Sequence, residues 1–119
     1  MIFFDSYAIL ELLRGNPSYT KYKNFALVTN TLNLSEVFYS LLKSEGKLIA
    51  EQMLENLNME FIEISEDIAI ESSKFKYLNR KKKLSYADCI GYTTARKLGF
   101  KFLTGDKQFK RMKGVEFVK

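Results

Sequence analysis

The sequence predicts an α/β protein: a three-layer α/β/α sandwich with a mostly parallel central sheet. Short apolar runs alternate along the chain with longer segments that have the 3.6-residue periodicity of amphipathic helices. Capping residues or glycines stand at the ends of these helical segments, and no repeat or linker divides the chain. Strands and helices that alternate in this way form parallel βαβ units with helices on both faces of the sheet. Because 119 residues suffice for one core, we expect a single domain over residues 1–119.

The N-terminal half is predicted to contain two strands and three helices. In order, we expect a strand at 1–4, a helix at 7–14, a short helix or loop at 19–24, a strand at 25–29, and helices at 32–45 and 47–57. The first long helix carries apolar residues at the i, i+3, i+4, i+7 and i+8 positions of a buried stripe. Gly46 separates the last two helices, so they should form a helical hairpin.

The C-terminal half is predicted to complete the sheet. We expect a strand at 60–64, a helix at 65–78, a basic connector at 80–83, a helix from Ser85 to the residue before Gly99, a strand at 100–103, a helical turn at 107–112 and a strand at 115–118. The strand at 60–64 is inferred from the alternation of polar and apolar residues in EFIEI. Both long helices begin at a serine, which is a favoured N-cap.

The composition restricts the chemistry available to the protein. Histidine is absent, which excludes Ser-His-Asp and Cys-His catalysis and every histidine-based metal site. The one cysteine, Cys89, excludes an intramolecular disulfide and is expected in the core. No apolar run approaches the roughly 18 residues of a membrane span, and Asp5 interrupts the apolar start too early for a signal peptide. We expect a cytoplasmic protein in which acid–base or metal chemistry falls mainly to Asp and Glu.

The net charge of +5 is unevenly distributed along the chain. Residues 1–79 contain 7 Lys and Arg against 11 Asp and Glu, whereas residues 80–119 contain 12 against 3. A C-terminal third this basic favours a polyanionic partner such as a nucleic acid. Lysines that only keep the protein in solution would give the same count, so both explanations stay open.

Four acidic residues are expected at one edge of the sheet. Asp5 follows the first strand and Asp106 follows the fourth, and ligands of open α/β sheets bind beyond the carboxyl ends of the strands. Asp88 and Glu36 lie in the first turns of their helices, at ends that can face the same edge. These placements predict that Asp5, Glu36, Asp88 and Asp106 meet in one crevice.

Each of these acids also has a purely structural explanation. Asp88 completes an imperfect capping box with Ser85. Asp106 can be a turn residue or a helix cap, and Asp5 can cap the helix that follows it. Glu36 can be a first-turn acid or an exposed side chain.

Four carboxylates gathered in one crevice would need a counter-charge. Two like charges about 4 Å apart repel by roughly 4 kcal/mol at an effective dielectric near 20. Without compensation, at least one carboxyl would stay protonated near neutral pH. Oxygen-only ligands suit a hard cation, so Mg²⁺ or Mn²⁺ is the expected cofactor. Such a cation can activate water and bind a phosphate oxygen, which predicts hydrolysis of phosphodiester bonds.

Four sequence segments have a recognisable order and spacing. They are IFFDSYAIL, NLSEVFYSLL, LSYADCIGYTTARKLG and FLTGDKQF. With this ordered set, which spans the fold almost from end to end, the chain resembles PIN-domain ribonucleases, and more narrowly the VapC-type toxins of toxin–antitoxin pairs. The resemblance implies a PIN-like fold and a metal-dependent endoribonuclease that cleaves single-stranded or looped RNA with a metal-activated water.

The resemblance also implies roles for individual residues. The ligands of Mg²⁺ or Mn²⁺ would be Asp5, Asp88 and Asp106, with Glu36 as a further ligand or a base that orients water. Ser6 and Thr104 would be supporting polar groups. The residues that would steer the RNA backbone are Arg80, Lys81, Lys82, Lys83, Lys107, Lys110 and Arg111. Many relatives carry a further acid two or three residues after the fourth, where this chain has Gln108 and Phe109.

A toxin of this kind implies protein partners. We expect a cognate antitoxin, whose tail would pack as an amphipathic helix in an apolar groove, and a homodimer. One alternative is a housekeeping PIN ribonuclease in RNA processing, which would have the same site. Another is a non-catalytic RNA-binding or antitoxin-binding module that keeps the fold. A phosphatase with an aspartyl nucleophile is a weaker alternative, because Tyr7 stands where it would need a second acid.

Overall fold

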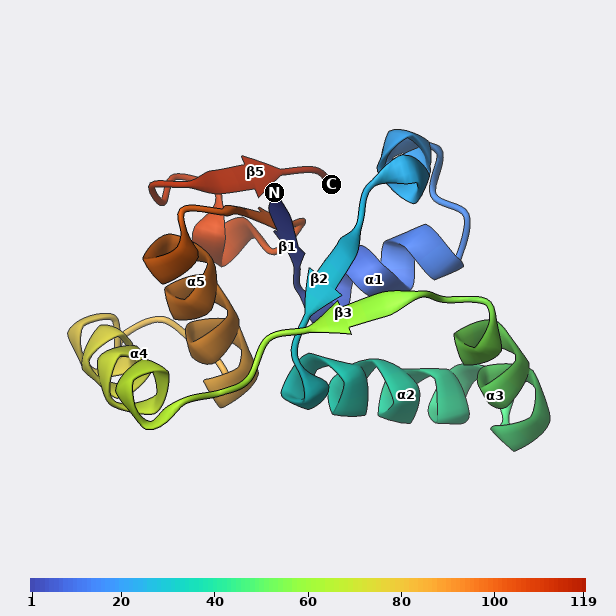
Figure 1. Cartoon of the computed structure of the whole chain (residues 1–119), viewed down its shortest axis with the longest axis horizontal. Coiled ribbons are helices and arrows are strands. Elements are labelled where there is room, and N and C mark those ends of the chain that lie inside the picture. The colour runs from blue at the N-terminus through green and yellow to red at the C-terminus, as the bar shows by residue number, and fades with distance from the viewer.

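A five-stranded sheet with the strand order β3-β2-β1-β4-β5 forms the centre of the computed structural model, which describes residues 1–119 (Figure 1). The strands are β1 (Ile2–Phe4), β2 (Leu27–Thr29), β3 (Met59–Phe61), β4 (Lys101–Thr104) and β5 (Val115–Phe117). All four neighbouring pairs are parallel. The predicted α/β class and parallel sheet are therefore confirmed.

Helices connect the strands and cover the sheet. They are α1 (Ser6–Leu13), α2 (Thr31–Glu45), α3 (Lys47–Glu55), α4 (Glu66–Leu78) and α5 (Tyr86–Leu98), with 3₁₀ helices η1 (Pro17–Asn24) and η2 (Lys107–Phe109). In Figure 1, α4 and α5 lie together on one flank, whereas α1, α2 and α3 lie on the other. The α2–α3 hairpin forms as predicted, and none of the helices has the length and apolar character needed to cross a membrane.

Alternating strand residues point into two separate cores. Ile2 and Phe4 of β1 pack with α1, α2 and α3, while Phe3 between them packs with α5. In β4 the side chains alternate in the same way: Phe102 packs in the core with Phe3, and Leu103 packs in the core with Ile2 and Phe4. Successive side chains of a strand point to opposite faces, so a strand that is apolar throughout is covered on both sides. The two cores are the physical basis of the three layers.

Several predicted elements are longer than the observed ones. The strand expected at 60–64 is observed as β3, whose ladder ends with the hydrogen bond from the Ile62 N–H to the Thr29 carbonyl (2.8 Å). It cannot continue because its partner β2 ends at Thr29, where Asn30 caps α2. The strand expected at 25–29 begins later because Phe25 still caps η1. The helical turn expected at 107–112 is reduced to η2.

Helix α5 approaches the sheet closely at Gly91. A Cβ atom built there would lie 3.0 Å from Cε1 of Phe3 and 3.2 Å from Cε1 of Phe102. The missing side chain lets α5 lie directly on the two central strands. This close contact holds the first turn of α5, with Asp88, at the carboxyl edge of β1 and β4.

Candidate active site

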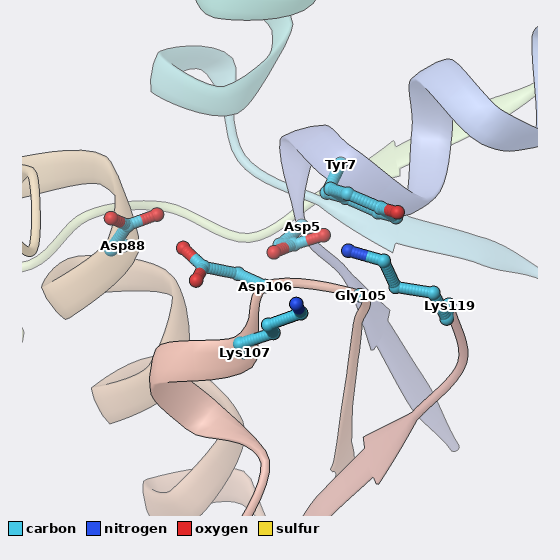
Figure 2. Close-up of a pocket in the computed structure, with 7 residues that line it drawn as sticks. All are labelled: Asp5, Tyr7, Asp88, Gly105, Asp106, Lys107 and Lys119. Carbon is cyan, nitrogen blue, oxygen red and sulfur yellow. The ribbon is translucent and has the colours of Figure 1, made fainter.

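Three of the four predicted acids line one pocket at the carboxyl edge of the sheet (Figure 2). We call it the acid pocket; its volume is about 420 Å³, and its lining residues are Asp5, Tyr7, Asp88, Gly105, Asp106, Lys107 and Lys119. Asp5 follows β1, Asp106 follows the neighbouring β4, and Asp88 comes from the first turn of α5. The structure thus brings these three acids together from parts of the chain about one hundred residues apart.

Each carboxylate also makes the local hydrogen bond that its structural explanation requires. Asp5 is the N-cap of α1 and accepts the Ala8 N–H (2.8 Å). Asp88 forms a complete capping box with Ser85, accepting its N–H at 2.8 Å. Asp106 caps η2. Because a carboxylate has two oxygens, capping fixes the orientation of each acid and does not remove it from the pocket.

Burial makes the charge on Asp5 unfavourable. The residue is 4% exposed, and its pKa is raised to about 7. Burial is the largest cause; the Thr104 hydroxyl and the Ala8 N–H lower the pKa, and the charges of Asp88 and Asp106 raise it further. The pKa of Asp88 is also raised, and burial is again the largest cause. Hydrogen bonds with Ser85 lower this pKa, whereas the charges of Asp106 and Glu36 raise it. The acids therefore act on one another electrostatically across the pocket.

Glu36 lies beside the acid pocket and does not line it. Its Oε1 accepts the Ser6 hydroxyl at 2.6 Å, and its charge reaches Asp88, whose pKa it raises. Asn33, one turn earlier on α2 and 2% exposed, accepts the Ser6 N–H (3.1 Å), and its Oδ1 lies 2.7 Å from the Ser6 hydroxyl oxygen. Ser6 therefore connects α2 to the loop that carries Asp5. Sequence reasoning missed Asn33, because a buried amide has no pattern of its own.

Thr104 supports two of the acids from within β4. It is fully buried, and its Oγ1 accepts the Asp106 N–H at 3.0 Å. Its hydroxyl also lowers the pKa of Asp5. Ser6 thus contacts Glu36 and Asn33 of α2, and Thr104 contacts Asp106 from the end of β4.

The predicted basic residues are spread over a wider surface. Lys107 lines the acid pocket, whereas Arg80, Lys81 and Lys82 line a separate hollow of about 370 Å³. Arg111 is exposed, and the Lys110 ammonium lies 5.3 Å from the centroid of the Phe117 ring. Sequence reasoning missed Tyr7 and Lys119 as lining residues. Only the pairing of β5 with β4 brings the end of the chain to this edge.

Gln108 attaches the basic connector, residues 80–83, to the turn after Asp106. Its Oε1 accepts the Lys83 N–H at 2.7 Å, and its Nε2 donates to the Lys83 carbonyl at 3.0 Å. The Lys82 ammonium donates to the Gln108 carbonyl at 3.0 Å. Gln108 thus fixes the basic connector to the residue that follows Lys107, which lines the pocket.

The donor chemistry of the pocket fits a hard divalent cation. All candidate ligands are carboxylate oxygens, and Asp5 is a buried acid with no cationic partner within ion-pair distance. No three acidic or cysteine side chains converge tightly enough to form a ready-made ligand set. The predicted four-acid cluster is therefore looser than expected, with three acids around the pocket and Glu36 beside it.

The chain belongs to the PIN domain family, whose model matches residues 2–115. Its fold resembles that of VapC20 from Mycobacterium tuberculosis, described as a sarcin-ricin loop cleaving toxin, with 17% identity, a TM-score of 0.79 and coverage of 99% of this chain and 97% of the other. A toxin–antitoxin complex from Klebsiella pneumoniae gives 22% identity, a TM-score of 0.74 and coverage of 98% and 96%. VapBC2 from Rickettsia felis, bound to a DNA fragment from its promoter, gives 17% identity, a TM-score of 0.75 and coverage of 99% of this chain and 98% of the other. Among curated protein sequences, none matches this chain.

Replacing Asp5 by Asn should stabilise the protein at neutral and alkaline pH. The folded-state pKa of Asp5 is raised, so the folded protein loses stability as pH rises from about 4 to about 7 and this carboxyl becomes charged. The difference between 3.8 and about 7 corresponds to a gain of up to about 4 kcal/mol for the variant. Asn also keeps the N-cap. Urea unfolding at pH 4 and pH 8 should show the gain at pH 8 alone.

The matched control is Asp67→Asn, which removes an exposed carboxyl from α4. It should not show this gain at pH 8. Equal stabilisation of Asp5→Asn at both pH values would contradict the assigned burial of Asp5.

Replacing Gln108 by Ala should release the basic connector. The change removes two hydrogen bonds to the Lys83 backbone, which together contribute about 1–3 kcal/mol locally. The Lys83 amide should therefore exchange with solvent faster in Gln108→Ala, as measured by NMR hydrogen exchange. Gln52→Ala, which removes an exposed glutamine from α3, should leave that exchange rate unchanged. An unchanged rate in Gln108→Ala would show that the connector is held by other contacts.

Proposed function

We propose that the protein is a metal-dependent endoribonuclease and the toxin component of a type II toxin–antitoxin pair. The observation that carries the proposal is the meeting of Asp5, Asp88 and Asp106 in one pocket of a PIN fold, with Lys107 on its rim. Membership of the PIN domain family supports the nuclease activity. The likeness to VapC20 and to toxin–antitoxin complexes supports the toxin role.

Asp5, Asp88 and Asp106 would hold Mg²⁺ or Mn²⁺ through their carboxylate oxygens. When bound, the cation supplies Lewis-acid charge at the scissile phosphate and makes water a stronger nucleophile at neutral pH. A cation near Asp5 also favours the ionised carboxylate and lowers the raised pKa of this buried acid. Glu36, held by Ser6, would orient the attacking water or bind the cation from the side of α2.

The basic surface would bind the RNA backbone. Lys107 stands on the rim of the acid pocket, and the connector held by Gln108 lies next to it. Further positive charge comes from Lys110 and Arg111 on the segment that follows η2. Phosphate contacts of this kind position a substrate without reading its sequence.

The toxin role implies protein partners and a location. A cognate antitoxin would cover the acid pocket, and the toxin would form a homodimer in the cytoplasm. The complexes from Klebsiella pneumoniae and Rickettsia felis are the observations that support an antitoxin partner.

Purified protein should cleave single-stranded or looped RNA with Mg²⁺ or Mn²⁺ and should not cleave it with EDTA. Asp88→Asn and Asp106→Asn remove a ligand charge from the pocket, so the rate should fall on the order of 10²-fold or more in each. Asp67→Asn is the matched control and should cleave like the wild type. Cleavage by all variants at the wild-type rate would indicate a contaminating nuclease and would contradict the assignment of the site.

Expression of the chain alone should arrest growth of a bacterial host. The arrest should be relieved by co-expression of the adjacent small reading frame and by the Asp106→Asn substitution, because both suppress cleavage. Colony counts after induction measure the effect. Normal growth at good expression, together with metal-dependent cleavage in vitro, would favour a housekeeping ribonuclease over a toxin.

A further inference from the structure

Tyr7 is built into the wall of the acid pocket. It lies in the first turn of α1, two residues after Asp5, and its half-buried ring lines the pocket (Figure 2). The ring lies directly against the backbone of Gly105: a Cβ atom built there would be 2.1 Å from Cε1 of Tyr7. Gly105 does not have a positive φ, so the backbone conformation does not require glycine at this position. The space that its missing side chain leaves is taken by the Tyr7 ring and by the Val118 carbonyl.

The Tyr7 hydroxyl differs from those of the core tyrosines. Tyr19, Tyr22 and Tyr92 each donate a hydrogen bond to a protein oxygen, as buried tyrosines generally do. Tyr7, by contrast, is only half-buried and lies in the wall of the acid pocket. Its ring is fixed against the backbone of Gly105 and remains part of the pocket surface.

Lys119 is held beside this ring by the end of the sheet. The Val118 N–H donates to the Thr104 carbonyl at 2.9 Å, and the Tyr19 hydroxyl donates to the Val118 carbonyl. These bonds place the Lys119 ammonium 6.0 Å from the centroid of the Tyr7 ring. In Figure 2 the Lys119 side chain points toward the space between Asp5 and Tyr7.

We propose that Tyr7 and Lys119 form a nucleotide subsite next to the cleaved bond. The Tyr7 ring stacks on the base of an adjoining nucleotide, and the Lys119 ammonium binds a neighbouring phosphate. Aromatic side chains stack on unpaired bases of any sequence, whereas a base inside a duplex is not available for such a contact. The subsite rests on the proposed ribonuclease function and adds to it a selection for single-stranded RNA without a preferred base at this position.

A Tyr–Lys pair alone does not define such a subsite. Tyr39 on α2 is exposed, and the Lys43 ammonium lies 4.6 Å from its ring centroid, but neither residue lines the acid pocket. What distinguishes Tyr7 is its place in the wall of the acid pocket, which it shares with the carboxylates and Lys119. Tyr39→Leu is therefore a matched control for Tyr7→Leu.

The test is a double-mutant cycle between the protein and its substrate. The cleaved bond of a short single-stranded RNA is first mapped with the wild type and Mg²⁺. RNAs with an abasic nucleotide on either side of that bond are then compared with the intact RNA. For the wild type, one of the two abasic RNAs should have a kcat/KM about tenfold lower, the size expected for one stacked base. Tyr7→Leu should show the same loss on intact RNA and no further loss on that abasic RNA.

The cycle separates stacking from a change in the fold. The subsite is wrong if the losses in kcat/KM from Tyr7→Leu and from the abasic nucleotide multiply. It is also wrong if Tyr7→Leu cleaves intact RNA as fast as Tyr39→Leu does. In both cases the ribonuclease function stands. If the wild type cleaves no RNA with Mg²⁺ or Mn²⁺, the proposed function itself fails. Should Tyr7→Leu unfold, Tyr7→Phe keeps the ring and must still discriminate intact from abasic RNA for the subsite to stand.

Lys119 is tested by salt dependence. The slope of log kcat/KM against log salt concentration should become shallower by about 0.7 in Lys119→Met, as expected for the loss of one phosphate contact with a single strand. Lys47→Met, which removes an exposed lysine from α3, should keep the wild-type slope. An unchanged slope in Lys119→Met would remove Lys119 from the subsite.

Discussion

The parallel pairing of β1 with β4 is the contact on which the acid pocket depends. It aligns Phe4 with Leu103, and the Asp5 N–H donates to the Leu103 carbonyl at 3.2 Å, so both strands end at the same edge. Phe3 and Phe102 stack beneath this edge with ring centroids 6.0 Å apart, on the face that α5 covers. Asp5, Asp106 and the first turn of α5 consequently occupy neighbouring positions although the chain separates them widely.

The same arrangement places polar groups at this edge in surroundings that destabilise the fold. Burial and two neighbouring carboxylates raise the pKa of Asp5 to about 7, and the amide nitrogen of Asn30 at the end of β2 is buried without a partner. An unpaired buried polar group costs about 1–3 kcal/mol. The apolar cores on both faces of the sheet offset such costs. A buried acid with a raised pKa in a pocket is a candidate for a functional site.

Groups of opposite charge lie close together around the acid pocket. The carboxylates form the floor, Lys107 and Lys119 stand at the rim, and Gln108 holds a further basic segment nearby. The N-termini of α1 and α5 also point at the acids, and their partial positive charge favours anionic groups there. Carboxylates and lysines thus line one opening, and the Tyr7 ring adds an apolar surface to the same wall.

Sequence alone determined the α/β class, the positions of most helices and strands, and the placement of three acids after β1, after β4 and in the first turn of α5. Periodicity and capping residues are local signals, so they can be read without the fold. Tertiary structure alone decided that Glu36 lies beside the pocket, that Gln108 holds the basic connector, and that Tyr7 and Lys119 meet. These outcomes depend on strand register and on side-chain contacts between distant segments, and neither leaves a periodic trace in the sequence.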